Sequence, residues 1–121
     1  MKRVRSLVVQ VLVVAMMMAV AGVAAAVTPE EALQLLMDGN KKFTEGNLAD
    51  LEANSTQAVR KALASGQKPY AIVLDCSDSR LSPEIIFDKG LGEIFVVRVA
   101  GNIVAPHQLG SIEYALSLIH I

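Results

Sequence analysis

The chain has 121 residues, a formal charge of −1 and 53% apolar residues. Its length suits one small domain rather than two. Beyond the first five residues there is no basic run, so nothing in the charge pattern suggests that the protein binds nucleic acid. The single cysteine, Cys76, cannot form a disulfide within the chain, which excludes a domain stabilised by internal disulfides.

The first 26 residues have the anatomy of a secretory signal peptide. The cationic start MKRVR is followed by an uncharged apolar run that ends in three alanines. We therefore expect residues 1–26 to be a signal peptide that is cleaved between Ala26 and Val27. The mature protein would be periplasmic or secreted.

An uncleaved membrane anchor is the alternative, since residues 7–26 are just long enough to span a bilayer. The small residues at the end of the run and the helix that follows favour cleavage, so we expect no stable membrane anchor. Mass spectrometry of the exported protein tests this expectation. Cleavage gives a chain that starts at Val27, whereas an intact Met1 would contradict it.

Strong helix signals open the remainder of the chain. Residues 27–46 predict a helix capped by Thr28, with Pro29 in its first turn and Glu31 completing a capping box. A Gly-Asn pair at positions 39–40 weakens the apolar stripe of this helix. It would form an N-terminal helical arm.

A loop and a second helix are expected over residues 48–69. Asn54 or Ser55 is the expected cap of that helix, and Gly66 is its expected end.

Two short apolar runs predict buried strands at residues 70–76 and 94–99. A short helix starting at Pro83 separates them, and a last helix is expected to begin at Gln108. Strands that alternate with helices indicate an α/β fold with a parallel sheet and flanking helices. Two strands are few for such a sheet, so we expect a fold truncated after about two strands.

The stretch CSDSR lies just past the end of the first predicted strand, where open α/β sheets bind their ligands. The thiolate of Cys76 is a strong zinc ligand. Asp78 has the spacing to reach the same side of the loop. Arg80 can hold the Asp78 carboxylate through two parallel hydrogen bonds. These residues could therefore hold a metal, with Asp78 aimed at its open position and fixed by Arg80.

Plainer interpretations of the same residues remain open. An isolated cysteine is often an inert, buried apolar side chain. An exposed Asp-Arg pair in a loop contributes little to stability. The cysteine phosphatases need a longer spacing between Cys and Arg, which argues against phosphate chemistry.

Three blocks in order carry a family resemblance: CSDSR after an apolar strand, PEIIFDKGLGEIFVVRVAGNIV, and GSIEYAL. Together with the leading TPEEALQLLMDGNKKF, they resemble the first half of a bacterial β-class carbonic anhydrase over roughly residues 28–116. On this resemblance, residues 27–121 would be the N-terminal part of such a domain.

The resemblance implies a zinc enzyme that interconverts carbon dioxide and bicarbonate. Cys76 would be the first zinc ligand. Asp78 would accept a hydrogen bond from the zinc-bound water, or swing onto the metal and close the site. Arg80 would hold Asp78 off the metal. Arg98 and residues 99–102 would line the site and an interface between subunits, since the resemblance also implies a homodimer or higher homo-oligomer.

The chain departs from the family at the other zinc ligands. The family supplies a His and a Cys from an H-x-x-C segment, and this sequence has no second cysteine. His107 precedes GSIEYAL and is expected at a helix start on the surface. His120 follows Tyr114 too closely to be the missing ligand. We therefore expect the 121 residues by themselves to be an inactive fragment.

Residues 116–121 read LSLIHI, which is the translation of a transposon-end adapter used in sequencing libraries. We expect these residues to be foreign sequence, although a natural helix can also have this sequence. A genomic stop codon directly after Ile121 would contradict the expectation.

Two other functions stay open from the residues alone. One is a non-enzymatic domain of the same fold that binds an anion at Arg80 and the glycine turns. The other is a membrane-tethered protein whose thiol pairs with a partner. An H-x-x-C segment downstream of Tyr114 favours the enzyme, and its absence favours the binding domain.

Overall fold

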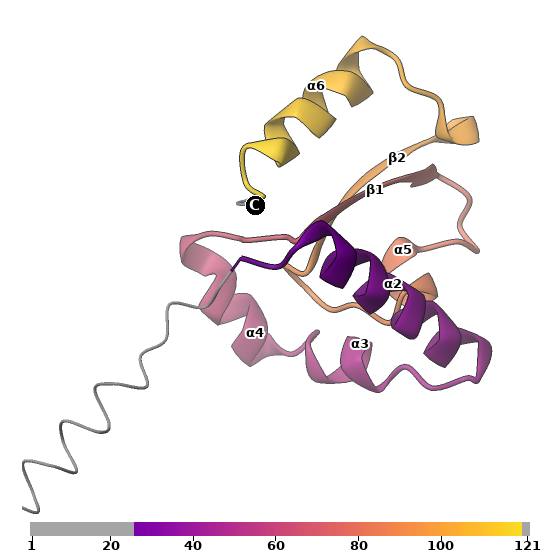
Figure 1. The fold of residues 1–121 in the computed structure, drawn as a ribbon, viewed down its shortest axis with the longest axis vertical. Helices are drawn as coiled ribbons and strands as arrows, with labels where there is room; N and C mark the ends of the chain where they lie inside the picture. The colour runs from indigo at the N-terminus through magenta and orange to yellow at the C-terminus, as the bar shows by residue number, and fades with distance from the viewer. Residues whose placement is uncertain (1–25, 120–121) are drawn as a thin grey trace, which may run out of the picture.

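A computed structural model describes residues 26–119 of the chain (Figure 1). They form two parallel strands with helices around them, so the predicted α/β fold class is confirmed. None of the helices between residues 26 and 119 has the length and apolar character needed to cross a bilayer. Residues 1–25 of the predicted signal peptide, and also His120, lie outside the described residues.

Helix α2, Pro29–Thr44, begins where the sequence predicts. Thr28 Oγ1 accepts a hydrogen bond from the backbone N–H of Glu31 at 3.2 Å, and the Glu31 carboxylate accepts one from the Thr28 N–H at 2.9 Å. The capping box is thus complete, and it satisfies two backbone donors that have no partner inside the helix.

The second predicted helix is instead two short ones, α3, Ala49–Ala53, and α4, Gln57–Ala62, followed by the 3₁₀ helix η1, Leu63–Ser65. The predicted caps, Asn54 and Ser55, are wrong, because both residues lie in the turn between α3 and α4. Thr56 caps α4 through its hydroxyl, which accepts a hydrogen bond from the Val59 N–H at 3.3 Å. Gly66 follows η1 as predicted.

The sheet consists of β1, Ala71–Cys76, and β2, Ile94–Val99, paired in parallel. Their register runs from Ala71 opposite Ile94 to Cys76 opposite Val99. Helix α5, Pro83–Ile86, lies between them in sequence, and the 3₁₀ helix η2, Ala100–Asn102, follows β2. Parallel strands bring their carboxyl ends to one edge, so the segments after β1 and after β2 meet there.

Helix α6, Pro106–Leu116, covers one side of the strands, while α2, α3 and α4 lie on the other side (Figure 1). It begins two residues earlier than predicted. The rings of Phe95 on β2 and Tyr114 on α6 meet edge to face, with centroids 6.1 Å apart. Ala115, near the end of α6, is fully buried. Its small side chain allows α6 to approach the strands closely.

The Gly-Asn pair that weakens the apolar stripe of α2 forms its contact with α5. A Cβ atom on Gly39 would lie 1.7 Å from the carbonyl oxygen of Phe87, so only glycine allows this close approach. Asn40 donates a hydrogen bond from Nδ2 to the carbonyl oxygen of Ile86 at 3.2 Å. The two residues that look unfavourable for an isolated helix therefore attach α2 to the segment leading into β2.

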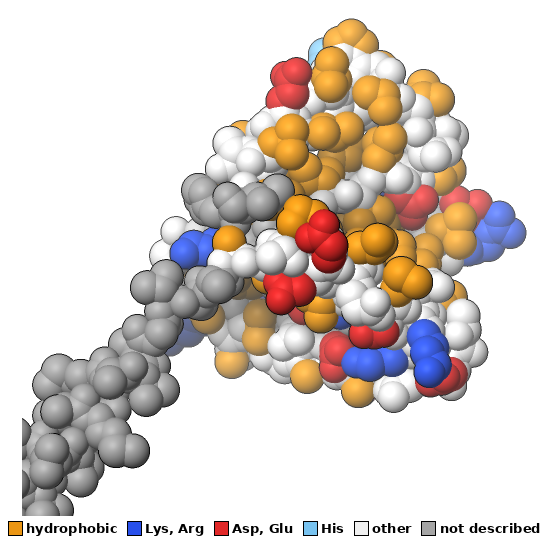
Figure 2. Space-filling view, in the orientation of Figure 1, with side chains coloured by type: hydrophobic (Ala, Val, Ile, Leu, Met, Phe, Trp, Pro, Cys, Tyr) orange, Lys and Arg blue, Asp and Glu red, His pale blue; other side chains and the backbone are white. Residues whose placement is uncertain are grey.

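Large apolar side chains remain exposed on two helices. Leu33 and Met37 are exposed on α2, and Leu109 and Tyr114 are exposed on α6. Figure 2 shows hydrophobic side chains gathered over α6. Exposed apolar side chains such as these can bind another apolar surface.

A buried carboxylate links α3 to the segment after α5. Asp88 has no exposed surface, and its φ of 48° lies in the left-handed region. Its carboxylate accepts hydrogen bonds from the N–H groups of Leu51 at 2.8 Å and Asp50 at 3.3 Å, and it lies 3.6 Å from Lys42 Nζ. Asp88 therefore caps α3 from a distance, since the residue before that helix provides no side-chain cap.

We predict that Asp88→Ala lowers the free energy of unfolding by about 2–4 kcal/mol, because it leaves two partly buried N–H groups without an acceptor. Asp88→Asn should cost about half as much, since asparagine tolerates the left-handed backbone and keeps one acceptor oxygen. Urea denaturation of the protein measures both values. Asp38→Ala, at an exposed position of α2, is the matched control. A loss below about 0.5 kcal/mol for Asp88→Ala, the size of an ordinary surface change, would contradict this role.

Candidate functional site

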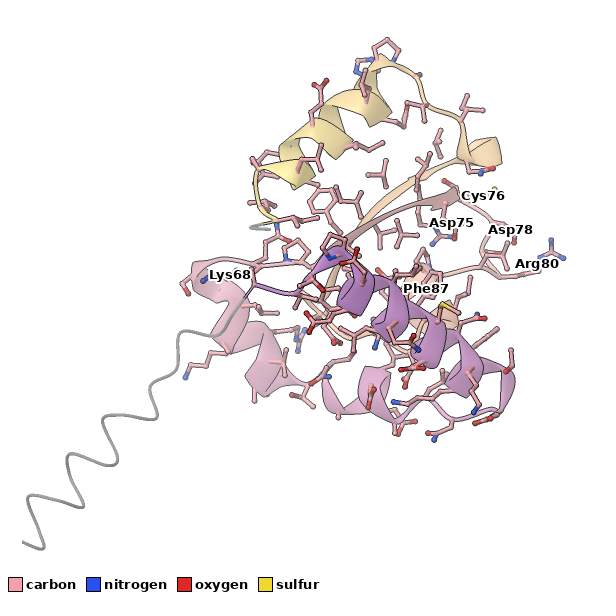
Figure 3. All side chains as sticks on the ribbon, in the orientation of Figure 1. Lys68, Asp75, Cys76, Asp78, Arg80 and Phe87 are labelled. Atoms are coloured by element: carbon pink, nitrogen blue, oxygen red, sulfur yellow. The ribbon has the colours of Figure 1, made fainter. Side chains whose placement is uncertain are left out.

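The CSDSR stretch lies at the carboxyl edge of the sheet, as predicted. Cys76 is the last residue of β1, and Asp78 and Arg80 follow it in the turn before α5. Figure 3 shows the three residues in succession at the end of the strand, with the Arg80 side chain directed outward. They therefore share one short segment whose start is fixed by the sheet.

Arg80 holds Asp78 through the paired hydrogen bonds that the spacing predicts. Arg80 Nε donates to Asp78 Oδ1 at 3.0 Å, and Nη2 donates to Oδ2 at 2.7 Å. The backbone N–H of Arg80 donates to the same Oδ1 at 2.9 Å. Three donors from one residue thus fix the plane of the carboxylate as well as its position.

This contact keeps Asp78 ionised. The side-chain hydrogen bonds from Arg80, and then its backbone N–H, lower the pKa of Asp78 to about 2. The same contact raises the pKa of Arg80. Because Arg80 is 84% exposed, this pair contributes little to overall stability. Its effect is on geometry and charge, since at neutral pH Asp78 is a fixed acceptor that carries no proton.

Cys76 is a free thiol that is partly buried between the ends of the two strands. Its sulfur lies 3.4 Å from the backbone N–H of Gly101, which donates to it. Gly101 has a φ of 74°, a conformation that glycine adopts without strain. The thiolate is the form of cysteine that binds metals.

The carboxylate of Asp75 contacts the backbone of Cys76. Its Oδ1 accepts the N–H of Cys76 at 2.7 Å, while Oδ2 is buried and has no hydrogen-bond partner among the residues that the structure describes.

Arg98 contacts the site in a way that sequence analysis missed. Its guanidinium donates to the backbone carbonyl oxygens of Cys76, Asp78 and Leu81, at 2.9, 2.5 and 2.7 Å respectively. The family resemblance implied only that Arg98 lines the site and an interface between subunits. Arg98 lies opposite Asp75 in the parallel register, one residue before CSDSR. Pairing the two predicted strands in this register could have indicated that Arg98 lies next to the CSDSR turn.

The donors present suit zinc in kind but not in number. Cys76 offers a thiolate and Asp78 a carboxylate, and zinc binds both. Within residues 26–119, no three His, Cys, Asp or Glu side chains come together as a metal site. His107 is an exposed residue in the first turn of α6, as predicted. Since zinc sites use three or four protein ligands, the described residues do not by themselves form a zinc site.

Comparison with known proteins finds similarity to carbonic anhydrases over part of the chain. Residues 71–121 match the family model described as carbonic anhydrase. Carbonic anhydrase 2 of Mycobacterium tuberculosis is 44% identical over 95 residues, which cover 77% of this chain and 44% of that protein. Where these matches lie, the chain is similar to carbonic anhydrases. The predicted family resemblance is thus confirmed over the part of the chain that these matches cover.

Other carbonic anhydrases match in the same way. The enzyme of Mycolicibacterium smegmatis is 42% identical over 93 residues, covering 77% of this chain and 44% of that protein. The solved β-carbonic anhydrase CcaA is 33% identical, with a TM-score of 0.49 over 74% of this chain and 44% of that chain. The chain therefore spans less than half the length of these carbonic anhydrases.

We predict that Arg80→Ala raises the pKa of Asp78 from about 2 toward its ordinary value of 3.8. The rise is partial, because the backbone N–H at position 80 still donates to the carboxylate. Since the pKa in the folded protein is the lower one, the pair stabilises the folded loop above pH 3.8, and this stabilisation is lost as the pH falls through about 2.

An NMR titration of the Asp78 carboxyl carbon in metal-free protein measures this pKa. Arg60→Ala, which removes an arginine from α4, is the control and should leave the titration of Asp78 unchanged. The same pKa in wild type and Arg80→Ala would show that Arg80 does not set the charge of Asp78.

Proposed function

We propose that the full-length protein catalyses the zinc-dependent, reversible hydration of carbon dioxide to bicarbonate. The observation that carries this proposal is the set of three hydrogen bonds that Arg80 donates to the Asp78 carboxylate. Asp78 lies two residues after Cys76, the thiol that ends β1. Identity of 44% with a carbonic anhydrase over 95 residues supports it.

In this proposal Cys76 is a zinc ligand and Asp78 a second, occasional one. Zinc supplies Lewis acidity, which lowers the pKa of a bound water to about 7. The Gly101 N–H holds the Cys76 sulfur from the side of η2, so the thiolate position is set by both strand ends.

Asp78 would orient the attacking water. An ionised carboxylate can only accept hydrogen bonds, so it fixes the direction of the water's O–H and turns a lone pair toward carbon dioxide. Arg80 keeps the carboxylate ionised and in place, which holds Asp78 in this role and away from the metal. A water molecule that is already oriented lowers the entropic cost of reaching the transition state.

We infer further that the 121 residues alone are inactive. The sequence contains one cysteine and two histidines. His107 is exposed in the first turn of α6, and the family pattern gives His120 no place among the zinc ligands. The remaining zinc ligands would come from an H-x-x-C segment downstream of Tyr114. Two donors on one turn should hold zinc weakly, so no fixed zinc would be present to lower the pKa of water.

We also propose that the full-length protein forms homo-oligomers. Exposed apolar side chains on α2 and α6, including Leu33, Met37 and Leu109, support this assembly. Size-exclusion chromatography with light scattering tests it. A monomeric full-length protein would contradict it.

We predict that the 121-residue chain does not hydrate carbon dioxide above a free-zinc control, whereas the full-length protein is active and binds one zinc per chain. In the full-length protein, Cys76→Ser should lose the zinc. Asp78→Asn and Arg80→Ala should keep the zinc and lose about 100-fold in kcat, because they remove the orienting groups and not the main ligands. Stopped-flow hydration assays and metal analysis measure these outcomes.

Asp38→Asn, at an exposed position of α2, is the matched control and should retain full activity. Activity of the 121-residue chain would contradict the argument about missing ligands. Full activity of Asp78→Asn would contradict the role given to that carboxylate. A full-length sequence without H-x-x-C would favour the anion-binding alternative over the enzyme.

A further inference from the structure

The segment that carries the candidate site has few backbone hydrogen bonds of its own. The Ser77 N–H donates to the carbonyl of Val99 at 3.2 Å, and the Leu81 N–H donates to the carbonyl of Asp78 at 3.1 Å. Beyond Ser77 the chain leaves the sheet, so the sheet no longer determines its path.

Arg98 supplies the missing attachment. Its side chain extends from β2 and donates to the carbonyl oxygens of Cys76, Asp78 and Leu81. These three carbonyls span the whole segment from the end of β1 nearly to the start of α5. One guanidinium thus ties the beginning, middle and end of the turn to the neighbouring strand.

The chemistry of the contact suits arginine and no other side chain. The guanidinium is flat, always charged and carries five N–H donors in a rigid arrangement, so it can serve three acceptors at once. A lysine ammonium has three donors on one atom and cannot match three separated carbonyls with the same geometry. A neutral side chain would lose the charge assistance as well.

We propose that Arg98 is a positioning residue that holds the segment Cys76–Leu81 in its folded conformation and so aligns Asp78 with the zinc-binding thiol. The claim that Arg98 affects catalysis rests on the function proposed above. The claim that Arg98 holds the conformation of Cys76–Leu81 does not, because it follows from the three hydrogen bonds alone.

Hydrogen exchange tests the attachment directly. The Arg80 N–H donates to Asp78 Oδ1, and the Leu81 N–H donates to the Asp78 carbonyl, so both amides report on the turn. In zinc-free full-length protein, Arg98→Ala should speed exchange at these two amides by about tenfold or more, because three charge-assisted bonds no longer oppose local opening. Arg98→Lys should give a smaller increase.

Chemical rescue distinguishes the loss of the Arg98 hydrogen bonds from a general loss of folding in the variant. Added methylguanidinium should slow exchange at Arg80 and Leu81 in Arg98→Ala, because it restores a planar donor to the carbonyls. Arg60→Ala is the matched control, and it should leave these amides unchanged with or without the additive. Unchanged exchange in Arg98→Ala would overturn the proposal.

Kinetics test the catalytic part. Arg98→Ala should keep its zinc and lose about tenfold in kcat with little change in KM, since a displaced Asp78 affects the transition state more than substrate binding. Methylguanidinium should restore part of the rate. An unchanged kcat would overturn the catalytic part. If the wild-type full-length protein does not hydrate carbon dioxide at all, the proposed function fails, while the exchange result still decides the role of Arg98 in the turn.

Discussion

The parallel pairing of β1 with β2 is the constraint on which the geometry of the candidate site depends. It sets Cys76 opposite Val99, so the turn that follows each strand lies at the same edge of the sheet. Only this register brings the Gly101 N–H to the sulfur of Cys76 and the Arg98 side chain to the turn. A shift by one residue would reverse the face of every side chain on β1.

Two arginines at this edge do different work. Arg80 binds a side chain, and its hydrogen bonds lower the pKa of Asp78 and fix the carboxylate plane. Arg98 binds only backbone carbonyls in this turn, and its hydrogen bonds fix the path of the chain. The position of Asp78 therefore depends on one contact to its carboxylate and another to its backbone. A carboxylate held in both ways can orient a water molecule without itself moving.

Local patterns in the sequence were sufficient to predict most of the helices and strands. The capping box at Thr28 and the two apolar runs predicted α2, β1 and β2 almost to the residue, because capping and burial act over short stretches. The pairing of Asp78 with Arg80 followed from their spacing. Contacts between distant segments could not be predicted in this way. Asp88 caps α3 from 37 residues away, and Arg98 reaches a turn 17 residues before it.

The central claim is that zinc binds at Cys76, beside a carboxylate that Arg80 keeps ionised and oriented. A crystal structure of the zinc-loaded full-length protein, with the metal located by its anomalous scattering, tests it most directly. The account predicts zinc about 2.3 Å from the sulfur of Cys76, with the Asp78 carboxylate still paired to Arg80 or bound to the metal. Zinc bound elsewhere, with Cys76 outside its coordination shell, would contradict the account.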